Sequence, residues 1–136
     1  MVKLYNKKRR ATCVALLFLV KFSFSAQIIE KRALWVVRDH MVSKEKIDKV
    51  LNFAIENNYN HLFVQIRGRG DAYYKSSLVP RSHLLQITFD PLEYIVKKAK
   101  SEEIKIHAWI NVFYLWSSPQ TPSQNGHILL NHPDHM

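Results

Sequence analysis

The sequence predicts an α/β fold in which parallel strands alternate with helices. Three short runs rich in Val, Ile, Leu and aromatic residues, at 33–38, 61–67 and 104–113, are separated by two segments whose apolar residues recur at helical spacing. The order along the chain is therefore β-α-β-α-β. The three runs are too apolar for strands with one face in water, which favours parallel strands with helices packed across them.

The first predicted helix begins after Ser43, because a serine side chain can accept a hydrogen bond from the free amides of a first helical turn. Asn57 and Asn58 favour a helix end. Between these residues the apolar positions recur at helical spacing with charged residues between them, and four are expected to face the core: Ile47, Val50, Leu51 and Ala54.

The second predicted helix has the clearest start in the chain. Asp90 is suited to cap it, Pro91 is suited to its first position, and Glu93 completes the pattern of a capping box. Its buried stripe is expected to be Leu92, Ile95, Val96 and Ala99.

The N-terminal segment predicts a secretory signal peptide over 1–25, followed by a domain over 26–136. A basic stretch at 7–10 precedes ten apolar residues at 11–20, and small residues at 23–26 permit cleavage after Ser25. The alternative is a membrane anchor, but ten residues are too few to span about 30 Å of hydrocarbon. We therefore expect export to the periplasm, cell surface or medium, with membrane contact only during export.

The net charge of +9 does not predict a nucleic-acid partner, because it is concentrated in the signal segment. Residues 1–25 carry six Lys or Arg and no Asp or Glu, whereas the remainder carries 14 against 11. Cys13, the only cysteine, also lies in that segment. The mature chain would therefore contain no disulfide, cysteine-based zinc site or catalytic thiol.

Polar and aromatic residues follow the carboxyl end of each predicted strand, where parallel βα folds bind their ligands. The first strand ends at 38–40 (Arg-Asp-His), the second runs into 67–71 (Arg-Gly-Arg-Gly-Asp), and the third ends at 109–111 (Trp-Ile-Asn), followed by Tyr114 and Trp116. Arg and Asn can hydrogen-bond hydroxyl or carboxylate groups, and aromatic rings offer flat apolar faces. This mixture suits a sugar.

Each of these residues also has a structural interpretation. Arg67 could form an ion pair with Asp71, and Asp71 could instead cap its own loop. Trp109 and Trp116 could pack beneath the long C-terminal loop. Asn111 is the better candidate for a site, because Asn is disfavoured in strands.

Three further motifs allow interpretations other than a sugar site. The tripeptide at 69–71 is the Arg-Gly-Asp that adhesion receptors bind, but it falls within the strand-end cluster. The glycine pattern at 68–70 lacks the features of a nucleotide-binding loop, so no cofactor is expected.

The segment 117–136 is rich in Pro, Asn and His and predicts a long loop without fixed geometry. No metal site is therefore expected from the group His127, His132, Asp134 and His135. His107, within the third strand, is interpreted as a core or barrel-wall histidine.

Four motifs, in this order and spacing, resemble the glycosyl-hydrolase-like family 10. They are Gln65-Ile66-Arg67 followed by Gly70-Asp71-Ala72-Tyr73-Tyr74, Asp90-Pro91-Leu92, His107-Ala108-Trp109-Ile110-Asn111, and Asn131-His132-Pro133-Asp134. The resemblance covers 33–134. Residues 112–114 (Val-Phe-Tyr) and His135 depart from the family pattern, which bears on loop contacts more than on the fold.

The resemblance implies an exported bacterial (β/α)8 barrel that acts on carbohydrate, in some relatives the glycan of the bacterial cell wall. Such a barrel takes about 250 residues, so this chain would supply its first three βα units. The catalytic carboxylates would then lie beyond Met136. The expected function is a fragment of an exported glycoside hydrolase acting on polysaccharide or peptidoglycan; the alternative is a non-catalytic glycan-binding protein. The residues expected to line the sugar cleft are Arg67, Asp71, Trp109, Asn111 and Tyr114.

Overall fold

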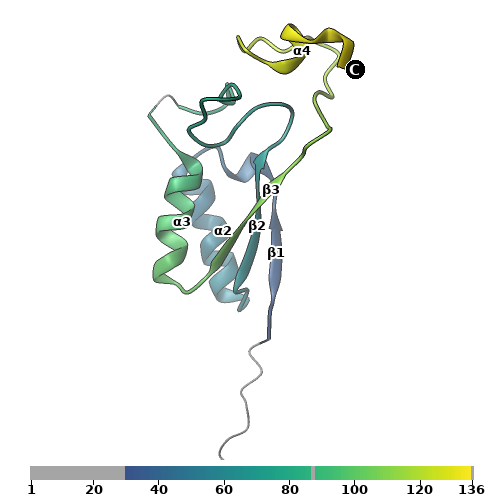
Figure 1. The fold of residues 1–136 in the computed structure, drawn as a ribbon. Helices are drawn as coiled ribbons and strands as arrows, with labels where there is room; N and C mark the ends of the chain where they lie inside the picture. The colour runs from purple at the N-terminus through teal and green to yellow at the C-terminus, as the bar shows by residue number, and fades with distance from the viewer. Residues whose placement is uncertain (1–29, 87, 136) are drawn as a thin grey trace, which may run out of the picture. The chain divides into compact units, whose positions relative to one another are not determined.

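The centre of the structure is a three-stranded parallel sheet with the order β1-β2-β3 (Figure 1). This computed structural model describes residues 30–86 and 88–135, so the predicted signal peptide lies outside the described residues. The strands are β1 (Ala33–Val36), β2 (His61–Arg67) and β3 (Lys105–Ile110). The predicted α/β class and the parallel direction of the strands are confirmed.

The third strand is shorter than the predicted span of 104–113. Its pairing with β2 shifts register between Gln65 and Arg67, where Arg67 lies opposite Ile110. Beyond this point the β2 chain turns away into the loop that follows Arg67. Among the described residues, the segment after Asn111 therefore has no neighbouring strand with which to continue the ladder.

Helix α2 (Lys44–Glu56) begins and ends where its sequence predicts. The Ser43 hydroxyl accepts a hydrogen bond from the Lys46 amide at 3.4 Å. At the other end, the Asn57 side chain donates to the Phe53 carbonyl at 2.8 Å, and Asn58 has a φ of 58°. This left-handed conformation is one that asparagine tolerates, and it ends the helix. Of the four expected core positions, three are buried and the remaining one, Val50, is partly buried.

Helix α3 (Pro91–Ser101) is capped by Asp90, as predicted. One carboxylate oxygen accepts from the Glu93 amide at 3.0 Å, and the other accepts from the Lys75 amide at 2.8 Å. Asp90 therefore fixes both the helix start and the preceding loop. The second half of the predicted capping box, in which the Glu93 side chain accepts from the Asp90 backbone amide, is not among the contacts of the described residues.

The predicted buried stripe of α3 is wrong at Val96, which is 46% exposed. Ile95 and Ala99 are fully buried, and Val96 lies about 100° around the helix from Ile95. On the opposite flank, Tyr94 packs against the core and donates its hydroxyl proton to Asp48 of α2 at 3.0 Å. The two helices are thus joined by a polar contact that hydrophobic periodicity does not reveal.

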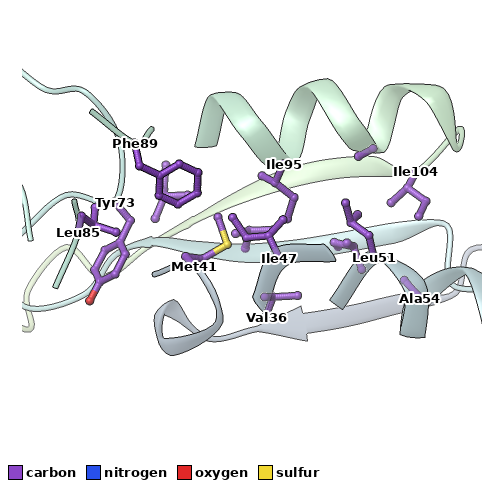
Figure 2. Close-up of a cluster of buried hydrophobic side chains, with 14 residues drawn as sticks. Val36, Met41, Ile47, Leu51, Ala54, Tyr73, Leu85, Phe89, Ile95 and Ile104 are labelled. Atoms are coloured by element: carbon purple, nitrogen blue, oxygen red, sulfur yellow. The ribbon is translucent and has the colours of Figure 1, made fainter. Parts of the chain in front are cut away.

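Both helices lie on one face of the sheet and enclose the hydrophobic core with it (Figure 1). Figure 2 shows the side chains of this core, with Ile47 and Ile95 near its middle. The sheet contributes aliphatic side chains that alternate along its strands toward the helices: Val36, Leu62, Val64 and Ile66.

The second face of the sheet is aromatic. Trp35 stacks on Phe63 at 4.8 Å between ring centroids and meets the edge of Trp109 at 5.1 Å. Phe63 in turn stacks on His107 at 4.8 Å, and His107 lies beside His61, with 2.7 Å between Nε2 and Nδ1. Trp35 is nevertheless 62% exposed. The expectation that helices cover these apolar strands therefore holds for one face within the described residues.

The C-terminal segment contains short helices where a loop was predicted. Helix α4 (Ile128–Asn131) and the 3-10 helix η2 (Pro133–His135) follow His127, whose side chain accepts from the Leu129 amide and so caps α4. Histidine is not a common N-cap, so the sequence gives no start signal here. None of the helices in the described residues is long and apolar enough to cross a membrane.

We expect Ile95→Ala to lower the free energy of unfolding by about 2–5 kcal/mol, because it opens a cavity beneath α3. Val96→Ala is the matched control on the same helix and should change it by about 0.5 kcal/mol. Urea unfolding followed by circular dichroism measures both. Equal losses at the two positions would contradict the observed orientation of α3.

We expect the protein to lose stability on acidification because of the His61–His107 pair. Burial lowers the pKa of His61, and the neighbouring charges of His107, Lys105 and Lys31 add to this effect. The unfolded chain, with an ordinary histidine pKa of about 6.5, then binds the proton more readily than the folded chain. The free energy of unfolding should therefore fall as the pH decreases below about 6.5.

Urea unfolding at pH 7.5 and pH 5.5 tests this expectation. His107→Gln should make the loss on acidification smaller, because it removes one positive neighbour of His61. His40→Gln, at an exposed histidine, should leave the loss unchanged. An unaltered pH dependence in His107→Gln would show that the pair is not its source.

Candidate functional site

Asn111 joins the carboxyl ends of β2 and β3. Its amide nitrogen donates to the Arg67 carbonyl at 3.2 Å, and its side-chain Nδ2 donates to the Gly68 carbonyl at 3.3 Å. Its side-chain oxygen accepts from the indole nitrogen of Trp109 at 2.9 Å. Three of the predicted site residues are thus brought together, and the contacts of Asn111 hold the strand ends in place.

Asp71 shapes the turn that follows β2. Its side chain is 6% exposed, and one carboxylate oxygen accepts from the Arg69 amide at 3.1 Å. Gly70, between them, has a φ of 75°, which glycine adopts without strain. This contact is the one expected if Asp71 caps its own loop. The other alternative, an ion pair with Arg67, is not formed within the described residues.

The neighbouring turn residue, Gly68, allows Arg38 to approach the backbone closely. A Cβ atom at Gly68 would lie 2.3 Å from a terminal nitrogen of Arg38. The backbone amide of Arg38 donates to the side-chain oxygen of Gln65, a buried residue of β2, at 3.2 Å. The 3-10 helix η1 (Arg38–His40) after β1 is thereby fixed against the end of β2.

A pocket of about 240 Å³ lies at these strand ends. The end of β1, the turn after β2 and the C-terminal segment all contribute to its lining, which includes Arg38, Asp39, Arg69, Asp71, Trp116 and Gln124. Of the predicted site residues, only Asp71 lines it. Arg67, Trp109 and Asn111 form the adjoining strand ends, and Tyr114 is an exposed residue of the following loop.

His127 connects the C-terminal segment to the turn at 69–71. It is fully buried; its Nε2 lies 2.5 Å from the Arg69 carbonyl oxygen, and its Nδ1 accepts from the Leu129 amide at 3.3 Å. These contacts require the neutral tautomer with its proton on Nε2. The Trp116 and His127 rings form a T-shaped pair with 5.2 Å between centroids, and the Arg69 guanidinium lies 5.9 Å from the centre of the Trp116 ring.

These contacts also decide between the alternative interpretations of the motifs. Both nitrogens of His127 are engaged, and no three His, Cys, Asp or Glu side chains gather as metal ligands in the described part of the chain. The Arg-Gly-Asp tripeptide is not available to a receptor, because Gly70 and Asp71 are buried and His127 covers the glycine.

The site residues that the sequence analysis did not propose are those contributed by distant segments. His127 contacts the Arg69 carbonyl across 58 residues and Gln124 contacts His83 across 41, separations for which no local pattern exists. Tyr73 lies beneath the pocket, and burial is the main cause of a raised pKa for its phenol, to which the Asp71 carboxylate adds. The phenol therefore stays protonated at neutral pH.

Residues 30–136 match a family model described as glycosyl hydrolase-like 10. This span includes every strand and helix described above and the whole candidate pocket. It confirms the family that the four sequence motifs indicate. No curated protein matches the chain.

We expect two substitutions of His127 to separate its two contacts. His127→Asn keeps an acceptor near Nδ1 for the α4 amide but cannot reach Arg69, and His127→Gln keeps a donor near Nε2 but loses the cap. Each should lower the free energy of unfolding by about 1 kcal/mol. Amide NMR should show a large shift at Gly70 only in His127→Asn, and faster hydrogen exchange at Leu129 only in His127→Gln. Identical spectra for the two variants would contradict this division.

Proposed function

The chain belongs to the glycosyl hydrolase-like 10 family, and from this premise we propose that it forms the first three βα units of a (β/α)8 barrel whose strand-end pocket binds a polysaccharide. The family implies a glycoside hydrolase-like function and a glycan as the partner. The observation that carries the proposal is the pocket in which Arg38, Arg69 and Trp116 meet at the carboxyl ends of parallel strands.

Two features of the sheet support a barrel. The strands are parallel and in sequential order, with both connecting helices on one face, as in successive units of a (β/α)8 barrel. The other face carries the aromatic cluster of Trp35, Phe63 and Trp109. Closure of the sheet by further strands would bury this face as the barrel interior and would pair the outer edges of β1 and β3.

The pocket has the chemistry that sugar recognition needs. A pyranose ring has apolar faces and a polar edge, so it is bound by an aromatic ring below it and hydrogen-bond donors around it. Trp116 supplies the ring and Arg38 supplies donors, while Gln124, whose side-chain nitrogen contacts His83, leaves its side-chain oxygen as an acceptor. Asn111 and Trp109, which hold the strand ends, would fix the position of this lining.

Hydrolysis requires a pair of carboxylates, one of which acts as an acid. The pocket contains Asp39 and Asp71, but Asp71 already accepts from the Arg69 amide, and Asp39 is 75% exposed, with one oxygen 3.9 Å from Arg38. Neither contact suits a proton donor held against a glycosidic oxygen. We therefore assign the catalytic carboxylates to later strands of the barrel.

The lack of a suitable acid in this pocket also favours the second candidate function, a non-catalytic glycan-binding protein of the cell surface. In either case the glycan of the bacterial cell wall is the substrate or ligand we propose. The signal pattern at 1–25 supports export to the compartment where that glycan lies.

We expect the purified protein to bind insoluble peptidoglycan, and Trp116→Ala to weaken binding by about ten-fold, because a stacking surface for a sugar ring is lost. Phe113→Ala is the matched control: this aromatic side chain belongs to the same loop, is 95% exposed and does not line the pocket. Sedimentation with the glycan measures binding, and the release of reducing ends measures hydrolysis.

Equal loss of binding in the two variants would contradict the proposed pocket. Binding without the release of reducing ends would favour the binding-protein candidate over the hydrolase. Absence of binding to peptidoglycan and to other polysaccharides would contradict both candidates.

A further inference from the structure

Three arginines gather at the strand ends with few partners. Arg38 follows β1, and Arg67 and Arg69 follow one another at the end of β2. Within 30–86 and 88–135, the Arg67 side chain makes no hydrogen bond or ion pair, and its Nε is buried. The Nε of Arg69 is likewise buried without a partner, and the guanidinium lies over the face of Trp116, 5.9 Å from its ring centre.

Arg81 shows how this protein treats a structural arginine. Its Nε is buried without a partner, as in Arg67 and Arg69, but its terminal nitrogen Nη2 donates to the backbone carbonyls of Gln86 and Phe89 and so closes the loop before α3. Arg38, Arg67 and Arg69 make no such contacts through their terminal nitrogens. A guanidinium has five donors in a fixed plane. In Arg67 and Arg69 the Nε donor is buried without a partner, and the terminal donors of all three arginines make no hydrogen bond within the described residues. Their arrangement is therefore explained better by a ligand than by the fold.

The carboxylates nearby do not satisfy these donors. Asp71 turns one oxygen to the Arg69 amide, and Asp39 lies 3.9 Å from the Nε of Arg38, which is too long for a hydrogen bond. At the strand ends three arginines stand against two aspartates, a formal excess of one positive charge. An incoming carboxylate would add the missing acceptors in the paired geometry that a guanidinium prefers.

We propose that this pocket recognises a sugar that carries a carboxylate group, with Arg38 and Arg69 as its ligands. The inference rests on the proposed glycan-binding function and deepens it, since it names the chemical class of the bound sugar. The Trp116 face supports the sugar ring beside the Arg69 guanidinium, and the acid group of the sugar lies between the two arginines that line the pocket. Arg67 strengthens the positive field from the adjoining strand end.

Calorimetric titration of the whole protein tests the proposal with two acidic probes and their neutral forms. The probes are trigalacturonic acid and the disaccharide of N-acetylglucosamine and N-acetylmuramic acid, each also used as its methyl ester. We expect at least one acid to bind about ten-fold or more tightly than its own ester, because a charge-assisted hydrogen bond is lost on esterification. The preference should decrease as the salt concentration rises.

The arginine variants assign the preference to residues. Arg69→Gln and Arg38→Gln should each reduce the preference for the acid to about two-fold or less. Arg69→Lys, which keeps the charge but not the paired geometry, should retain an intermediate preference. Arg32→Gln is the matched control, because Arg32 is an exposed arginine beside Tyr59, before β1 rather than at the carboxyl ends of the strands.

The outcomes separate this inference from the function on which it rests. Equal binding of acid and ester by the unaltered protein would overturn the inference and leave glycan binding intact. Binding of none of the four probes, together with none of the polysaccharides, would overturn both. A preference for the acid that persists in Arg38→Gln and Arg69→Gln would overturn the assignment to these arginines, as would tighter binding of a sulfated sugar than of either acid.

Discussion

The parallel pairing of β2 with β1 on one side and β3 on the other is the constraint on which the rest of the structure depends. It sets Trp35, Phe63 and His107 in one row across the sheet, and Val36, Val64 and Ala108 in the next. Because side chains alternate along a strand, these rows face opposite sides. The same pairing brings all three carboxyl ends to one edge. The pocket lies at this edge because the strands are parallel.

The apolar surface on the two faces of the sheet is shielded from water in different ways. On the helix face, aliphatic side chains interlock with α2 and α3, and Ile47 and Ile95 are completely buried there. On the other face, flat rings cover one another, and the outermost ring, Trp35, remains largely in contact with solvent. A histidine pair extends this row in place of aliphatic residues. The second face therefore has the composition of a surface that further chain can cover, which is the physical basis for the barrel interpretation.

Local patterns were sufficient to predict the three strands and the helices α2 and α3. Ser43, Asp90 and the apolar periodicities act within a few residues, so the sequence contains the whole of their effect. The failures all depend on distant contacts. Tyr94, on the flank of α3 opposite Val96, is fixed by Asp48 of the other helix, and His127, which caps α4, is held against Arg69. Hydrophobic periodicity and loop composition carry no information about such pairs.

The same distinction separates the residues that build the site from those that face a ligand. Asn111 lies at the strand end where the sequence analysis expects it, yet both polar groups of its side chain are used within the protein: the nitrogen bonds Gly68 after β2, and the oxygen bonds Trp109 of β3. Asp71 likewise is engaged by the Arg69 amide. The side chains left with free donors are arginines, whose length lets them extend beyond the backbone that holds them. Because Asp71 bonds the backbone of its own turn, the arginine side chains beside it keep donors for the carboxylate of a bound sugar.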